Sequence, residues 1–455
     1  MAKTQFKLSK YIIPTTISMV LIGTYTNIDG LFIGNAAGDN GLAAINIAWP
    51  IVAFITAVGT GLGVGGSVII SGLMGEKKYK EVEKTKFTAL MLLFGAGIAL
   101  TVLCLALFYP LLLLMGARGV VLDYARQYSL IISAGALFQV VGSGIVVLLR
   151  SDGKTVQSMV YTFVGLVLHI LLDIILVKKL LLYGVALSTV ISQASVMILG
   201  LCTYKVTERK RWSTKKILAT STAPFGVNFV PSLTLMFTNY FALKIGGTAA
   251  VSAYAVMSYV VYTYDYIFQG VCDGTQPILS FTNGSGYEEE RKRTVRIAIL
   301  SLAGFAALTM SITPVVKTLL PSIFSVSPEA EMLINHGLTI YAFSYIFKAL
   351  VKWMCAYSYS VNNIWIANIL TYVDPLLFSP ACLVVLPMFF GIDGIWMSLT
   401  ISQVLACILG LVLIFSYRSH EHSLLEEVSE SREFEDEDIN KEIINQVEEK
   451  VLDDK

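Results

Sequence analysis

Long apolar stretches follow one another almost without pause along this chain, and polar residues gather in the short segments between them. Each stretch reaches the roughly 20 residues that an α-helix needs to cross a bilayer. The pattern therefore predicts an all-α membrane protein with twelve transmembrane helices. The expected spans are 10–33, 43–72, 87–115, 127–149, 156–178, 183–205, 215–245, 248–281, 294–321, 330–358, 363–389 and 391–417.

Two segments of the first half recur in the second half. Residues 184–193 return as 394–403, an offset of 210, and the glycines and serines of 61–75 return in 270–284, an offset of 209. This agreement indicates duplication of a unit about half the chain long. Duplicated halves around a central site are a common build of secondary transporters. Because each half has six spans, the second half begins on the same side as the first, and we expect two parallel six-helix repeats.

This pattern predicts an N-lobe at 1–205, a C-lobe at 206–417 and a tail at 418–455. The tail is rich in Asp and Glu and is expected to be a solvated acidic segment in the cytoplasm. Lys and Arg are concentrated in the loops on the side of the N-terminus, among them the loop 150–154 that begins with Arg150. The positive-inside rule then places both termini in the cytoplasm. We expect the protein to lie in the cell membrane.

Composition narrows the class of protein. The chain is 55% hydrophobic and 14% charged, which is far more apolar than a soluble domain of this length. Its six cysteines fall within predicted spans without a CxxC pair, and the motifs of zinc proteases, serine hydrolases and phosphate-binding loops do not occur. We therefore expect no enzyme activity, no metal site and no cofactor. Basic clusters are interpreted as topology signals, so no nucleic-acid partner is expected, and no obligate protein partner is evident.

Ionisable residues inside the spans are the candidate functional groups, because such groups are costly in hydrocarbon and normally face a bundle interior or a wet cavity. In the first half, Asp29 lies in the first span, and His169 and Asp173 lie one turn apart on one face of the fifth span. For each candidate, the alternative is a structural hydrogen bond or a helix interface. The candidates for substrate contacts or a C-lobe cavity are Asp265, Asp273, Gln276, Lys348 and Asp374, and Lys352 follows one turn after Lys348.

Several of these segments resemble one known family. Residues 27–34, 42–46, 61–75, 149–153, 172–173, 184–193 and 276–277 look like motifs of the multidrug and toxic compound extrusion (MATE) transporters, and especially of the bacterial MepA-like branch. The resemblance covers residues 8 to about 417 in order. It implies two six-helix lobes that enclose a cavity open to each side in turn, and export of organic cations in exchange for H⁺ or Na⁺.

The resemblance also implies a coupling-cation site in the N-lobe. The family uses an Asp in the first helix, an Asn and an Asp one turn apart in the fifth, and a Thr in the sixth. Asp29, Asp173 and Thr189 match these positions, whereas His169 stands where Asn is usual. An Asn carbonyl suits a hard cation and an imidazole suits a proton, so the choice between Na⁺ and H⁺ stays open.

The residues and the resemblance together predict a secondary active multidrug exporter that works by alternating access. Its expected partners are small organic cations or amphiphiles and the lipid bilayer. The alternative is a flippase for a lipid-linked oligosaccharide or a related amphiphile, since Lys348 and Lys352 are suited to holding a pyrophosphate. Asp29 and Asp173 argue against that alternative. A membrane-embedded enzyme would need a catalytic motif, and the sequence has none.

Overall fold

The computed structural model describes residues 7–324 and 326–416, so the predicted acidic tail at 418–455 lies outside the described residues. Contacts divide the chain into a large unit, Met1–Cys407, and a second unit, Ile408–Lys455. All sites discussed below lie in the large unit. Of the second unit, the structure describes the end of the last helix, Ile392–Ser416.

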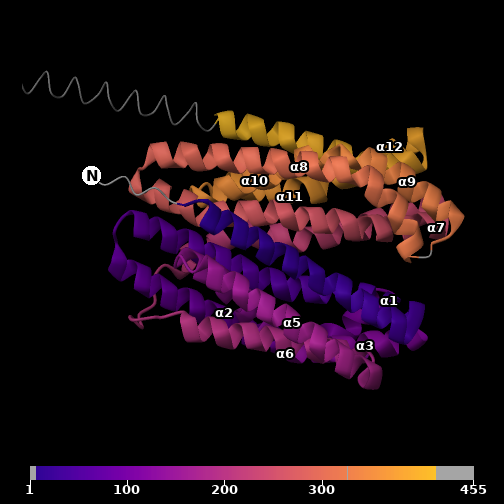
Figure 1. The fold of residues 1–455 in the computed structure, drawn as a ribbon, viewed down its shortest axis with the longest axis horizontal. Helices are drawn as coiled ribbons and strands as arrows, with labels where there is room; N and C mark the ends of the chain where they lie inside the picture. The colour runs from indigo at the N-terminus through magenta and orange to yellow at the C-terminus, as the bar shows by residue number, and fades with distance from the viewer. Residues whose placement is uncertain (1–6, 325, 417–455) are drawn as a thin grey trace, which may run out of the picture. The chain divides into compact units, whose positions relative to one another are not determined.

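The regular elements of the described residues are helices (Figure 1). In the first half they are α1 (Ser9–Gly75), α2 (Tyr79–Leu114), α3 (Gly119–Ala134), α4 (Ala136–Ser151), α5 (Thr155–Leu180) and α6 (Leu182–Thr203). In the second half they are α7 (Thr214–Ser285), α8 (Glu288–Phe324), α9 (Pro328–Ala342), α10 (Ser344–Ser360), α11 (Ile364–Val373), the π-helix η1 (Asp374–Phe378), α12 (Ser379–Phe390) and Ile392–Ser416.

Within the described ranges, nine helices are long and apolar enough to cross a membrane, and two bent pairs raise the number to eleven. The 72-residue α7 contains two helices joined at Gly247, which makes twelve spans. The predicted all-α membrane fold is confirmed. The bends were not predicted: the fourth span is α3 and α4 at 59°, and the tenth is α9 and α10 at 50°.

The breaks in the helices repeat with the sequence. Gly38 interrupts α1 at φ 60° and ψ −153°, and Gly247 interrupts α7 at φ 65° and ψ −158°. The two glycines are 209 residues apart. Because this backbone region is open to glycine and almost closed to other residues, both halves use glycine to turn the chain between their first and second spans.

A single inserted residue explains why the repeat has two offsets. The fifth span of the first half, Thr155–Leu180, has 26 residues, and the matching span Ile364–Phe390 has 27. The first is a regular α-helix, whereas the second contains η1. A π-helical turn accommodates one extra residue within a helix. The offset is therefore 209 before η1 and 210 after it.

Each half packs around its longest helix. Helices α2–α5, drawn in purple to magenta, contact α1, and helices α8–α12, drawn in orange to yellow, contact α7 (Figure 1). The two halves meet chiefly where α1 packs on α7. The lobe boundary at 205 and 206 stays a prediction.

Close glycine contacts between α1 and α7 are reciprocal. A Cβ on Gly61 would lie 2.9 Å from the Cβ of Phe225, and Gly270 packs on Thr16 in the same way. Both members of the second contact are related to those of the first by 209 residues. Contacts that exchange partners in this way are the signature of a two-fold axis between the repeats.

Candidate functional site

A cavity of about 520 Å³ lies between the two halves. Its walls come mainly from α1 and α7, with one or two residues each from α3, α4, α6 and α10. Three charged side chains line it: Asp29 from α1, Asp265 from α7 and Lys352 from α10. Aromatic rings form much of the remaining surface, namely Tyr25, Trp49, Tyr128, Tyr259, Tyr262 and Tyr266. Such rings hold organic cations through cation–π contacts and apolar area.

The three ionisable N-lobe candidates lie in one buried cluster behind the cavity wall. His169 Nε2 is 2.7 Å from Asp29 Oδ1 and 3.1 Å from Asp173 Oδ2. His169 and Asp173 are one turn apart on α5, as their spacing predicts, while Asp29 reaches them from the first half of α1. Asp29 both lines the cavity and contacts the histidine, so it connects the cavity to the buried cluster.

Tyr25 completes this cluster and was absent from the predicted cation site. Its ring centroid is 4.9 Å from that of His169, and its hydroxyl donates to the carbonyl of Thr162 at 3.3 Å. The close approach requires glycine at position 165, where a Cβ would lie 2.6 Å from the Tyr25 hydroxyl. The sequence offers only a weak sign of this role. Tyr25 lies one helical turn before Asp29, but the chain has many other aromatic residues, so this position alone did not single it out.

The cluster has unused polar atoms. His169 Nδ1 and Asp173 Oδ1 are buried without a hydrogen-bond partner. The Asp29, His169 and Asp173 ligand atoms lie within 4.8 Å of one another, close enough to surround a small cation. Two carboxylates around one imidazole also form a site that accepts a proton, because the carboxylates favour the charged ring. The arrangement therefore suits exchange of either a proton or a metal cation.

Thr189 lies on the wall of the large cavity, as Asp29 does. Its hydroxyl donates to the carbonyl of Val185 on its own helix, at 3.0 Å. Among the described residues, no hydrogen bond joins Thr189 to Asp29 or Asp173. Its role as a cation ligand stays a prediction.

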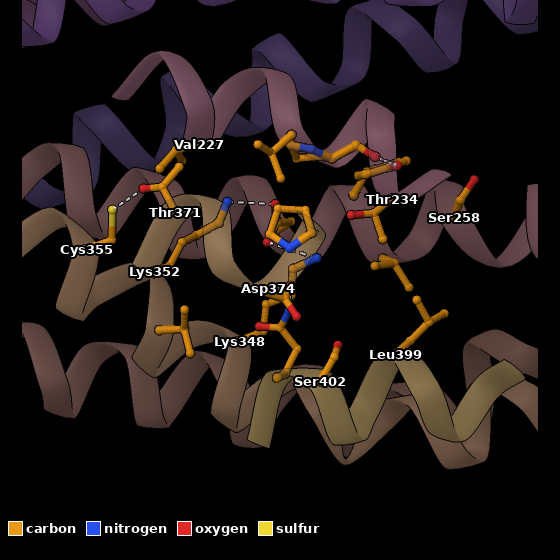
Figure 2. Close-up of a pocket in the computed structure, with 18 of the residues that line it drawn as sticks. Val227, Thr234, Ser258, Lys348, Lys352, Cys355, Thr371, Asp374, Leu399 and Ser402 are labelled. Carbon is orange, nitrogen blue, oxygen red and sulfur yellow. Dashed lines mark hydrogen bonds and ion pairs between the residues drawn. The ribbon is translucent and has the colours of Figure 1, made fainter. Parts of the chain in front are cut away.

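A second charged cluster lies in the C-lobe, around Asp265. Lys352 Nζ is 2.6 Å from Asp265 Oδ2, and Lys348 Nζ is 3.3 Å from Asp265 Oδ1. Figure 2 shows both lysine side chains extending from α10 toward a smaller cavity of about 120 Å³. Asp265 and Lys352 line both cavities, so the small cavity, called the side pocket below, adjoins the large one.

Asp374 lies on the wall of the same side pocket (Figure 2). It is the first residue of η1. Its Oδ2 accepts a hydrogen bond of 2.6 Å from Gln403 Nε2, and its carboxylate also interacts with Ser402 and Lys348. The extra residue of the second repeat therefore lies beside a cavity. Single π-helical turns are frequent at functional sites.

The two remaining candidates, Asp273 and Gln276, line neither cavity. Asp273 Oδ2 forms a buried ion pair of 3.1 Å with Arg150 Nη1, and Asp273 Oδ1 accepts from Gln269 Nε2 at 2.7 Å. Gln276 Oε1 accepts from Ser67 Oγ at 2.8 Å. Both residues therefore join the two halves of the chain, and contact with substrate stays a prediction for each.

Arg150 was predicted to begin a loop, but it is buried at the end of a helix. It is the penultimate residue of α4, and it is only 2% exposed. A basic residue at the end of an apolar span resembles a topology signal, and the carboxylate that pairs with it lies 123 residues further along the chain. The sequence therefore offered no local sign of this ion pair.

A protein-family comparison agrees with the resemblance in the sequence. The model of the family MatE matches residues 14–175 and 225–372. The chain is 23% identical over 420 residues to "Multidrug export protein MepA" of Staphylococcus haemolyticus, covering 90% of this chain and 92% of that protein. It is 24% identical over 422 residues to the protein of the same name from Staphylococcus saprophyticus, with 89% and 92% covered.

Solved structures share the fold. A structure described as the outward-facing conformation of a multidrug resistance MATE family transporter superposes with a TM-score of 0.85 at 20% identity, covering 91% of this chain and 95% of the other. The MATE multidrug transporter DinF-BH, solved in complex with a ligand, gives a TM-score of 0.82 at 25% identity, covering 90% and 95%.

Proposed function

Since the chain belongs to the MatE family of multidrug efflux transporters, we propose that it exports organic cations and amphiphiles across the cell membrane in exchange for H⁺. One observation carries the choice of ion. His169, which stands where the family resemblance implies Asn, contacts both Asp29 and Asp173 through the same ring nitrogen. An imidazole between two carboxylates is suited to taking up and releasing a proton.

The coupling follows from the position of Asp29. Its carboxylate faces the cavity, where it attracts an organic cation, and it also contacts His169. A proton that enters the cluster neutralises one negative charge and weakens the hold on the bound cation. Transport further requires that protonation favour one arrangement of the lobes over the other, since a ligand moves an equilibrium only by its differential affinity.

The packing of the halves supports alternating access. Four glycines pack closely against the other half, Gly61 and Gly65 of α1 and Gly270 and Gly274 of α7. The large cavity also lies between α1 and α7, but these four glycines do not line it. The positive-inside rule predicts that the loops at the closely packed end are cytoplasmic, and we propose on that ground that the cavity serves the outer side. Rocking of the lobes about the two-fold axis would open the packed end and close the cavity.

The test is ethidium efflux from proteoliposomes under an imposed H⁺ or Na⁺ gradient. We expect efflux under the H⁺ gradient, loss of it in Asp173→Asn, and normal rates in Asp123→Asn, which changes an exposed carboxylate on α3. Efflux under the Na⁺ gradient alone would contradict H⁺ coupling. No efflux of ethidium or other organic cations under either gradient would refute the exporter, and lipid-linked oligosaccharides would be the next substrates to test.

A further inference from the structure

A buried ion pair joins the two halves just beyond the large cavity. Arg150 Nη1 of α4 lies 3.1 Å from Asp273 Oδ2 of α7, and only 2% and 5% of the two side chains are exposed. Gly274, the next residue of α7, packs on the backbone of α1 at Ile12, so the pair belongs to the closely packed end. A motion that parts the halves at this end separates the two charges.

This ion pair is incompletely satisfied. Arg150 Nε and Nη2 are buried without a hydrogen-bond partner among the described residues. A guanidinium has five N–H donors, and a buried donor without a partner costs free energy. Buried ion pairs also seldom stabilise a fold more than packed apolar side chains would. A role in stability therefore does not account for this pair, whereas a contact that is made in one arrangement of the halves and broken in the other does.

The other repeat has no equivalent of this pair. The offset of 209 places Tyr359 opposite Arg150 and Val64 opposite Asp273, and both of these side chains are buried. The duplicated scaffold thus packs with uncharged residues at the equivalent positions. The two charges therefore serve something other than the architecture that the repeats share.

Gln269 connects the ion pair to the large cavity. It lies one turn before Asp273 on α7, and its Nε2 donates a 2.7 Å hydrogen bond to Asp273 Oδ1. Gln269 lines the large cavity, whereas Arg150 and Asp273 do not. Its Oε1 is buried without a partner among the described residues, so the bond to Asp273 is what orients the amide. A molecule in the cavity that binds this amide competes directly with Asp273.

We propose that Arg150 and Asp273 form a latch that holds the closely packed end shut, and that Gln269 is a positioning residue that links this latch to the cavity. With the cavity empty, Gln269 holds the Asp273 carboxylate against Arg150. A bound molecule that takes the Gln269 amide as its own hydrogen-bond partner weakens the latch and favours opening. Occupancy shifts this equilibrium only if the molecule binds more tightly to the open arrangement. The link to the cavity rests on the proposed export function, and the latch does not.

The experiment measures the distance between the halves at the closely packed end. Lys80 and Glu289 are the second residues of α2 and α8, they are exposed, and they occupy equivalent positions in the two repeats. Spin labels are attached to Lys80→Cys and Glu289→Cys in the full-length protein, with the exposed native cysteine removed by Cys202→Ser. Pulsed electron paramagnetic resonance in lipid nanodiscs then gives the ratio of long to short distances, and a larger ratio reports opening.

The latch is tested without any substrate. The double variant Arg150→Met with Asp273→Leu removes both buried charges and leaves apolar side chains in their place, so we expect it to fold. Its ratio should exceed that of the wild type about fivefold or more. The control is Asp393→Asn, which removes a carboxylate paired with His336 within one half and should leave the ratio unchanged. An unchanged ratio in the double variant would overturn the latch.

The link through Gln269 is tested with ethidium at a concentration that saturates each variant, as measured by fluorescence anisotropy. Ethidium should raise the ratio of the wild type about fivefold or more. Gln269→Leu keeps a side chain of similar size without the amide, and it should have a raised ratio that ethidium no longer changes. Loss of affinity alone would not produce this result, because each variant is saturated.

Two results would overturn the link. One is an equal response to ethidium in the wild type and in Gln269→Leu, and the other is a wild type whose ratio ethidium leaves unchanged. Failure of ethidium efflux in proteoliposomes would refute the exporter and the link together. The latch would still stand or fall on the double variant, because that comparison needs no substrate.

Discussion

Ser67 Oγ donates a 2.8 Å hydrogen bond to Gln276 Oε1, and these two residues occupy equivalent positions in the two repeats, 209 residues apart. A residue contacts its own repeat equivalent only when both lie beside the symmetry axis. Gln276 Nε2 also donates to Ser280 Oγ at 3.0 Å, so the bond belongs to a buried polar chain. The axis about which the lobes are related therefore passes close to this pair, between α1 and α7.

We predict that Gly274→Ala disturbs this packing. The new Cβ would lie 2.8 Å from Ile12 Cα and 3.0 Å from the carbonyl oxygen of Tyr11, so the backbone of α1 must shift. Overpacking of this kind typically costs about 1–3 kcal/mol. Thermal unfolding in detergent should show a lower midpoint, and efflux should slow. Gly304→Ala on α8, where nothing lies within 4 Å, is the control and should leave both unchanged.

We predict that Asp273→Asn destabilises the protein strongly. It leaves the buried charge of Arg150 without its partner, at a cost of about 3–5 kcal/mol. Thermal unfolding of the purified protein measures the effect, and Asp123→Asn is the control with an exposed carboxylate. The double variant Arg150→Met with Asp273→Leu should recover much of the loss, because it removes both charges together. An unchanged midpoint in Asp273→Asn would show that the pair contributes little.

We predict that His169→Asn changes the driving ion. The amide cannot take up a proton, whereas its carbonyl oxygen accepts a hard cation. Efflux driven by an H⁺ gradient should fall about tenfold or more, and efflux driven by Na⁺ should appear. His336→Asn on α9, whose ring pairs with the partly exposed Asp393 at 3.2 Å, is the matched control. Undiminished H⁺-driven efflux in His169→Asn would assign the proton to the carboxylates alone.

We predict that Gly38→Ala and Gly247→Ala have similar effects. No atom lies within 4 Å of a Cβ at either position, so the cost comes from the backbone alone. Their φ and ψ values belong to a region almost restricted to glycine, and a side chain there costs about 1–3 kcal/mol. Both variants should lower the midpoint of thermal unfolding, whereas Gly95→Ala, inside α2, should not. A large difference between the two variants would contradict equivalent turns.

The sequence by itself determined the fold class, the twelve spans and the duplication. A segment that crosses the hydrocarbon core must form all its backbone hydrogen bonds within the protein, because no water is present there. Apolar stretches of about 20 residues therefore predict membrane-spanning helices directly. The same physics marked Asp29, Asp173 and Lys348 as candidates, because a charge inside such a stretch is costly. The sequence also showed two offsets, 209 and 210, without a reason for the difference.

Only the tertiary structure decided which of these residues meet. Asp29 contacts His169 across 140 residues, and Lys352 contacts Asp265 across 87. Arg150 looked like a loop residue and is buried against Asp273. The extra residue proved to be a π-helical turn at Asp374. Helical periodicity tells which residues share a face, but the neighbour of that face is set by packing between distant segments, and the chemistry of the site depends on that packing.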